Sequence, residues 1–198
     1  GTEIVEYLKS IGVAFGSDLN ANTTFDHTLF ILPIPTDTLA QVKRGLQILD
    51  DWASGVTFPQ KDMDEERGII QGERTSHLGA GQRIQDKQFP VVFKGSRYAD
   101  RVPIGTKESL NAMQRAALVR FYKTWYRPDR MAVIAVGDFA PNAMEQMIKD
   151  QFSDNPAATS PLPDTTFNGP PTPGTAVSVA TDPEVPATGV AMLYKEPD

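Results

Sequence analysis

Two glutamates, Glu66 and Glu73, stand seven residues apart in a segment whose pattern predicts a helix. Seven residues make almost two full turns, so both carboxylates share one face of that helix. Ile69 and Ile70 fall between them on the same side, which mixes charge with aliphatic surface as in the wall of a partly buried site. A buried carboxylate needs a cation or a hydrogen-bond donor, so this face is a candidate for binding a metal ion.

The pattern alone leaves a simpler interpretation open, because charges on a helix usually mark its solvated side. Both glutamates could then pair with nearby cations such as Lys61, Arg67 or Arg74. His77 follows Glu73 by one turn and could be a further metal ligand. A histidine near the C-terminal end of a helix is also favoured by the helix dipole, so His77 is left out of the candidate site.

The composition narrows the classes of partner and site. The chain has 198 residues, no cysteine and a net charge of -6. No basic patch is visible in the sequence, so nucleic acid is not an expected partner. No apolar run is long enough to span a bilayer. Without cysteine there is no disulfide, thiolate metal site or cysteine nucleophile, and His27 and His77 alone are too few for an all-histidine metal site.

Hydrophobic periodicity predicts an α+β fold in which a mixed, largely antiparallel sheet has helices packed on one face. A continuous apolar run over 28–34 predicts a strand buried on both faces, paired antiparallel with the segment before it. A second apolar run over 131–136 predicts another buried strand. Helices are predicted over residues 3–11, 37–54, 59–78, 82–89, 109–125 and 141–152.

The composition changes after residue 153, where nine of the 16 prolines lie. Such a proline-rich stretch is typical of a linker. Residues 176–180 and 189–194 then have the pattern of strands that begin a further unit. We therefore predict one domain over 1–155, followed over 156–198 by a linker and the first strands of the next domain. The abrupt helical pattern at the start suggests that the domain lacks its own beginning.

Several stretches together give the chain a family resemblance. It resembles the pitrilysin/insulinase group of zinc metallopeptidases, which includes the mitochondrial processing peptidase. The order and spacing of the stretches fit that group up to about residue 155, and the proline-rich part resembles the link to a second domain. The matching stretches are EIVEYL at 3–8, NANTTFDHT at 20–28, ERGIIQGE at 66–73, PIG at 103–105, FYKTWYRPD at 121–129 and MAVIAVGD at 131–138.

The resemblance implies a processing-peptidase-like fold and specific roles for four residues. The family binds zinc with two histidines of an inverted His-x-x-Glu-His motif, whose glutamate activates water. The third zinc ligand is the second glutamate of a Glu-x6-Glu pair, which corresponds to Glu73, and Glu66 would orient the site. Asn20 and Ala21 correspond to an edge strand that binds extended substrate, and Glu73 is expected close to it.

The His-x-x-Glu-His motif is not in this sequence, and its family position would lie upstream of Gly1. The general base is therefore expected upstream, and this chain alone should contain no catalytic residue and no bound zinc. Retention of Glu66 and Glu73 favours a piece of a true zinc endopeptidase that hydrolyses peptides or small proteins. A non-catalytic homologue that acts as a binding or assembly subunit is the first alternative. A binding domain outside the family, with solvated glutamates, is the second.

The resemblance also implies partners and a location. The expected partners are a peptide substrate and either the second half of the same protein or a homologous subunit. By family analogy, the protein is expected in the bacterial periplasm or cell envelope.

Overall fold

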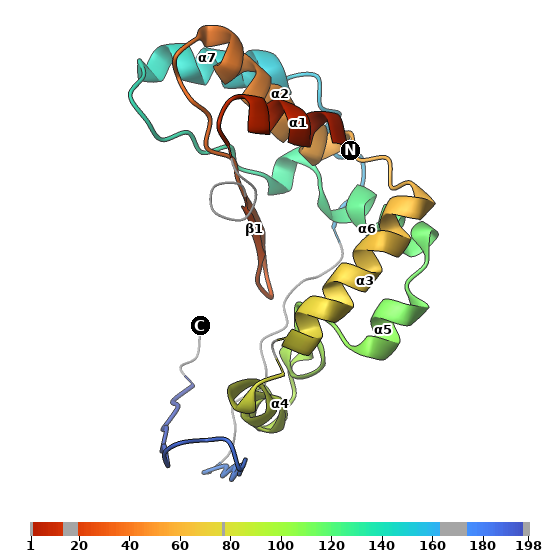
Figure 1. Cartoon of the computed structure of the whole chain (residues 1–198), viewed down its shortest axis with the longest axis vertical. Helices are drawn as coiled ribbons and strands as arrows, with labels where there is room; N and C mark the ends of the chain where they lie inside the picture. The colour runs from red at the N-terminus through yellow and green to blue at the C-terminus, as the bar shows by residue number, and fades with distance from the viewer. Residues whose placement is uncertain (1, 14–19, 77, 163–173, 196–198) are drawn as a thin grey trace. The chain divides into compact units, whose positions relative to one another are not determined.

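A computed structural model describes residues 2–13, 20–76, 78–162 and 174–195. The chain divides into two compact units (Figure 1). The first unit comprises Gly1–Phe58 and Gln114–Pro163, and the second comprises Pro59–Met113 and Asp164–Asp198. Each unit is described by itself below.

Helices dominate the described residues, with one small sheet. None of these helices combines the length and the apolar character needed to cross a membrane. The first unit holds α1 (Thr2–Ser10), β1 (Asn20–Thr23), β2 (Thr28–Ile31), α2 (Leu39–Ser54), α6 (Arg115–Trp125), the 3-10 turn η2 (Pro128–Arg130) and α7 (Pro141–Phe152). The second unit holds α3 (Gln60–Ser76), α4 (Ala80–Val92), η1 (Arg97–Asp100) and α5 (Lys107–Ala112).

The core of the first unit forms where α1 packs on α2. Leu8 and Ile48 are almost completely buried, and Val13 joins them just after α1. The apolar stripe of α1 therefore faces the core, as its helical periodicity predicts. Partly buried side chains surround this centre: Ile4, Tyr7, Ile11, Leu32, Ile34 and Trp52.

Polar contacts hold α2 against its neighbours. Thr38 and Gln41 form a reciprocal capping box that begins α2. In its last turns, Asp50 accepts hydrogen bonds from Gln151 at 2.8 Å and from Asn155 at 2.7 Å, which ties α2 to the end of α7. Figure 1 shows α2 and α7 side by side.

Tyr122 joins α6 to the end of α2. Its hydroxyl donates to the backbone carbonyl of Trp52 at 2.7 Å, and its ring meets the Phe58 ring edge-on at 5.2 Å. Burial raises the pKa of the Tyr122 hydroxyl, so the group remains a hydrogen-bond donor at neutral pH.

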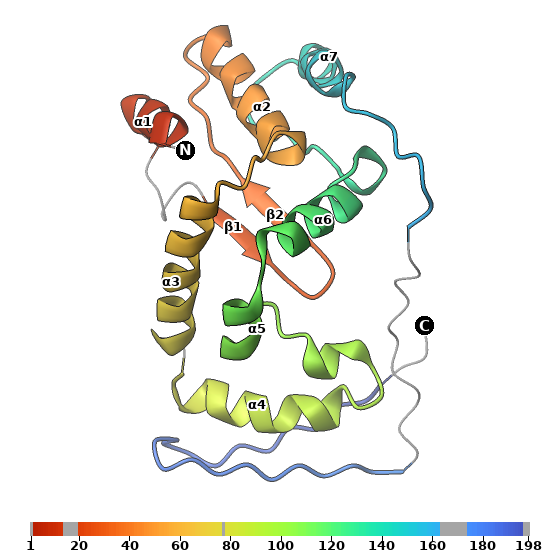
Figure 2. The ribbon, with the colours of Figure 1, turned by 90° about the vertical axis from the view of Figure 1, so that its right-hand side faces the viewer.

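The sheet in the described residues is smaller than the sequence predicts. β1 and β2 pair antiparallel in a two-stranded hairpin, with Ala21 opposite Phe30 (Figure 2). The prediction that this second strand is buried on both faces is wrong, since Leu29 is 47% and Ile31 is 46% exposed. Phe30 alone packs on aromatic rings, 5.7 Å from Trp52 and 6.3 Å from the ring of a tyrosine after α6. The alternate side chains therefore face away from those rings.

The predicted strand over 131–136 is also wrong as a strand. Met131, Val133 and Ala135 are partly covered, whereas Ile134 and Val136 are 76% and 92% exposed. This alternation is that of an extended chain, but a strand requires hydrogen bonds to a neighbour, and the described residues supply none. The predicted strands over 176–180 and 189–194 likewise have no partner strand among the described residues. Among the described residues, a two-stranded antiparallel hairpin with seven helices is thus present in place of the larger mixed sheet that the sequence predicts.

The helix predicted over 109–125 is divided in two. Thr106 forms a capping box with Ser109, so α5 begins earlier than expected. Met113 and Gln114 then adopt extended backbone angles, and a new helix, α6, begins at Arg115. The sequence did not predict this break, because the apolar periodicity continues across it. Two residues with extended backbone angles hardly change the spacing of the apolar positions.

In the second unit, Arg83 of α4 holds the segment that follows residue 174. It donates to both carboxylate oxygens of Asp182, at 2.6 and 2.7 Å, and also pairs with Glu184. The Asp182 side chain is only 7% exposed, whereas that of Glu184 is 69% exposed. The hydrogen bonds from Arg83 lower the pKa of Asp182 to about 2.

This ion pair predicts a loss of local stability in acid. The pKa of the Asp182 carboxyl group is lower in the folded protein than its ordinary value of 3.8. Its contribution to the stability of the folded state is therefore complete at pH values above 3.8. The contribution is then lost as pH falls through about 2. The protection factors for hydrogen exchange of the Glu184 and Val185 amides, which are corrected for the intrinsic pH dependence of exchange, should therefore fall as pH falls between these values, and Arg83→Ala should lower them at neutral pH. Glu184→Gln is the matched control and should have a smaller effect. Unchanged exchange in Arg83→Ala would show that this pair does not hold the segment.

Candidate functional site

Hydrogen bonds to α5 fix the rotation of α3 about its axis. The guanidinium of Arg67 donates to the backbone carbonyls of Leu110, Asn111 (3.2 Å) and Met113 (2.9 Å). Gln71, one turn later, donates to the side-chain oxygen of Asn111 at 2.7 Å. These bonds satisfy carbonyls at the end of α5 that have no partner within the helix. Figure 2 shows α3 alongside α5, and one side of α3 is therefore committed to this contact.

Glu66 and Glu73 both lie in α3 and both are exposed. Helical geometry places them nearly in line, about 100° around the axis from the Arg67 side that contacts α5. Ile69, between them, is 62% exposed. The predicted mixture of carboxylate and aliphatic surface is thus present on one face of α3, turned away from α5.

Two cations of α3 pair with acidic residues other than these two glutamates. Lys61 lies 3.7 Å from Glu65, and Arg67 lies 3.7 Å from Asp64. Within the part of the chain that the structure describes, neither Glu66 nor Glu73 forms an ion pair. Both glutamates are exposed, as the simpler interpretation expects, but the described residues give neither of them the ion pair that it also expects.

Glu73 offers one carboxylate to a metal ion. Across the described ranges, no three His, Cys, Asp or Glu side chains gather in a group that could hold a metal. His77 lies outside the described residues. Since a catalytic zinc site uses three protein ligands, Glu73 alone does not make one.

The other predicted residues, Asn20 and Ala21, begin strand β1. The hairpin closes with a hydrogen bond from the Thr24 N–H to the His27 carbonyl at 2.9 Å. The Ala21 N–H bonds instead to the side-chain oxygen of Asn20 at 2.8 Å. Because backbone groups alternate between the two sides of a strand, this donor faces the edge that β2 does not use. No described strand covers that edge, so an extended peptide could add there.

The structure thus brings Glu66 together with Glu73, and Asn20 together with Ala21. The first pair belongs to the second unit and the other pair to the first unit. The predicted closeness of Glu73 to the edge strand remains a prediction.

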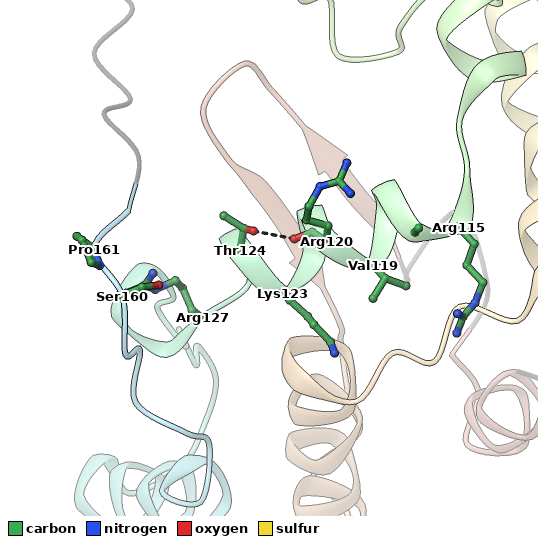
Figure 3. Close-up of a pocket in the computed structure, with 9 residues that line it drawn as sticks. Arg115, Val119, Arg120, Lys123, Thr124, Arg127, Ser160 and Pro161 are labelled. Carbon is green, nitrogen blue, oxygen red and sulfur yellow. Dashed lines mark hydrogen bonds between the residues drawn. The ribbon is translucent and has the colours of Figure 1, made fainter.

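One feature of the first unit was missed from the sequence. Four cations of α6 and of the turn that follows it line a pocket of about 550 Å³ (Figure 3). These residues are Arg115, Arg120, Lys123 and Arg127. No run of basic residues marks them in the sequence, but the spacing of Arg115, Arg120 and Lys123 places these three within one half of the helix circumference.

Two models of a single peptidase family match the chain. The model described as insulinase (peptidase family M16) matches residues 1–83. The model described as the peptidase M16 inactive domain matches residues 112–198.

Curated relatives give the same result. The chain is 33% identical over 196 residues to a protein of Arabidopsis thaliana named zinc protease PQQL-like, covering 98% of this chain and 20% of that protein. It is also 33% identical over 157 residues to the probable zinc protease PqqL of Escherichia coli, covering 79% of this chain and 17% of that protein. The chain therefore spans about a fifth of the length of these relatives.

Solved structures of related proteases share the fold. The first half of the periplasmic protease PqqL from Escherichia coli matches with a TM-score of 0.81 and 30% identity, over 87% of this chain and 36% of that chain. The ferredoxin protease FusC, solved in complex with Arabidopsis ferredoxin, matches with a TM-score of 0.75 and 29% identity, over 83% of this chain and 18% of that chain. Sequence models, relatives and structures agree, and the chain belongs to the insulinase family of metallopeptidases, peptidase family M16.

Proposed function

We propose that this chain is part of a zinc-dependent endopeptidase that hydrolyses peptides or small proteins. In this proposal Glu73 is the third zinc ligand, Glu66 orients the site, and β1 pairs with the substrate through Asn20 and Ala21. The names of the relatives, which are zinc proteases, support the reaction type.

The observation that carries the proposal is the exposed carboxylate face of α3. Glu66 and Glu73 stand on one side of a helix whose rotation is fixed by Arg67 and Gln71. Neither glutamate forms an ion pair among the described residues, whereas Glu65 and Asp64 on the same helix do. Carboxylates without an ion pair among the described residues are free to accept contacts from a bound metal ion or from its other ligands.

The donor set fits zinc in part. A carboxylate oxygen is a normal zinc ligand, and Glu73 can bind through one or two oxygens without breaking a hydrogen bond seen in the structure. Glu66, two turns earlier, can accept hydrogen bonds from other ligands and hold them in position. The bound ion would polarise the scissile carbonyl and activate water. The remaining ligands are proposed to come from the family's histidine motif.

Strand β1 would hold the substrate. The Ala21 N–H is bonded to the Asn20 side chain, which keeps this edge donor satisfied until a peptide arrives. An incoming strand could exchange that hydrogen bond for one to its own carbonyl and release the Asn20 amide to bind it as well. Main-chain pairing of this kind accepts many sequences, which suits an endopeptidase.

The domain arrangement and location follow the same proposal. Residues 1–155 would form most of a peptidase domain, and 156–198 would link it to the next domain. The partners would be a peptide substrate and the second half of the protein or a homologous subunit. Because one similar protease is periplasmic, we propose a periplasmic or envelope location.

Peptide hydrolysis by the full-length protein tests the function. A purified sample should cleave an unstructured peptide library, lose cleavage on treatment with a chelator, and recover it on addition of zinc. A full-length protein that neither binds zinc nor cleaves peptides would instead be the non-catalytic homologue, and the endopeptidase proposal would be wrong.

Two substitutions in the full-length protein separate the proposed roles. Glu66→Gln should lower zinc affinity and activity by about 10–100-fold, and excess zinc should restore part of the activity. Asn20→Ala should leave zinc content unchanged and raise KM, with no response to zinc. The checks are zinc content by mass spectrometry and steady-state kinetics. If zinc rescues Asn20→Ala, or if neither variant differs from wild type, the roles are assigned wrongly.

A further inference from the structure

The basic pocket on α6 is a second site, unrelated to the carboxylate face of α3. Its four cations come from α6 and the turn after it, and Ser160 and Pro161 also line it (Figure 3). The volume of about 550 Å³ lies in the range of ligand-binding clefts. The whole chain carries a net charge of -6, so this cluster is a local reversal of its overall charge.

Two of the four cations already have partners. Arg127 binds Asp129 through two nitrogens, at 2.6 and 3.0 Å, and its side chain is 12% exposed. Arg115 donates to the backbone carbonyls of Thr57 and Phe58, which carry no net charge. The Asp129 carboxylate therefore balances only one of the four positive charges. The two backbone carbonyls hold the Arg115 side chain in place but do not neutralise its charge.

Arg120 and Lys123 are the cations available to a ligand. Both are exposed, and neither forms an ion pair within the described ranges. The Thr124 hydroxyl beside them is committed to the Arg120 backbone carbonyl at 2.7 Å, so it leaves these charges free. Exposed cations that have no acidic partner among the described residues attract anions.

The positions of the four cations indicate which class of anion fits the pocket. The cations lie within thirteen residues of chain, from Arg115 to Arg127, which would be about 18 Å along a helix, and Figure 3 shows Arg120 and Lys123 leaving α6 in different directions. A single phosphate could reach only one or two of them. Val119 and Pro161 add apolar surface between the charges. An extended chain with spaced carboxylates and aliphatic parts matches both features.

We propose that this pocket binds an acidic peptide segment in extended form, with Arg120 and Lys123 as its main charge contacts. The proposal does not rest on the protease assignment, since it concerns binding in the first unit and no reaction. The charges would increase the association rate and select acidic over neutral segments.

Fluorescence anisotropy on the 198-residue chain tests the proposal. This chain lacks the His-x-x-Glu-His motif, so cleavage does not interfere with the measurement. The probe is a labelled six-residue peptide of alternating Glu and Ala, which is about 20 Å long when extended and so matches the cation row of about 18 Å. The probe should bind to the chain, and its affinity should fall as salt is added. The same peptide with Gln in place of Glu should not bind.

Charge reversal locates the site. Arg120→Glu with Lys123→Glu removes two attractions and adds two repulsions, so the affinity should fall by about tenfold or more. Lys43→Glu, on exposed α2 surface outside the pocket, is the matched control and should change affinity less than twofold. Both sites are exposed, and circular dichroism checks that the variants fold. Equal affinity of the double variant and wild type would overturn the proposal. So would tighter binding of inorganic polyphosphate or single-stranded DNA of equal charge, which would identify a phosphate-chain site instead.

Discussion

Replacing Glu73 by glutamine in the full-length protein should reduce zinc content and peptide cleavage together. Glutamine keeps the size of the side chain and one carbonyl oxygen but removes the charge that binds the ion. Substitution of a residue that only contacts a metal ligand typically lowers metal affinity or activity by about 10–100-fold. Loss of a direct ligand should therefore lower activity by about 100-fold or more. Zinc content by mass spectrometry and kcat/KM on one peptide measure the two effects. High zinc concentrations should restore part of the activity.

Glu65→Gln is the matched control for this variant. Glu65 lies on the same helix and is also exposed, but it pairs with Lys61 and points to a different side of α3. It should retain zinc and activity, since a surface ion pair contributes little to stability. If Glu73→Gln and Glu65→Gln behave alike, α3 does not supply the metal ligand.

Ile48→Ala should have the largest effect on stability within the chain. Ile48 is 1% exposed and packs against Leu8 and Val13 between α1 and α2. Removing three carbon atoms there leaves a cavity, which typically lowers the free energy of unfolding by about 2–5 kcal/mol. Urea denaturation followed by circular dichroism measures the change.

Leu39→Ala controls for the loss of a large side chain from the same helix. Leu39 is 59% exposed at the first turn of α2, so its truncation should cost about 0.5 kcal/mol or less. An Ile48→Ala variant that is as stable as Leu39→Ala would show that α1 does not pack on α2 as described.

The 3.6-residue periodicity of apolar positions predicted the helices of this chain better than runs of apolar residues predicted its strands. The stripe of α1 and the shared face of Glu66 and Glu73 depend only on local spacing, which a sequence contains. Burial of 28–34 and 131–136 depends on which segments lie beside them. Leu29 and Val136 are apolar and suited to strands, yet both are exposed among the described residues. Composition alone cannot supply the neighbour that a strand needs.

Long-range polar contacts were also beyond prediction. Arg67 was expected, in the simpler interpretation, to neutralise a glutamate of its own helix. Instead it bonds three backbone carbonyls more than forty residues away at the end of α5. Family resemblance identified Glu73 and Asn20, but the hydrogen bond that occupies the Ala21 N–H required coordinates.

The most direct test is anomalous diffraction at the zinc absorption edge from crystals of the full-length protein. The account predicts one zinc ion with a Glu73 carboxylate oxygen about 2.0–2.2 Å from it and with Glu66 outside direct contact. A zinc ion whose ligands exclude Glu73, or crystals with no zinc at this helix after soaking in zinc, would contradict it.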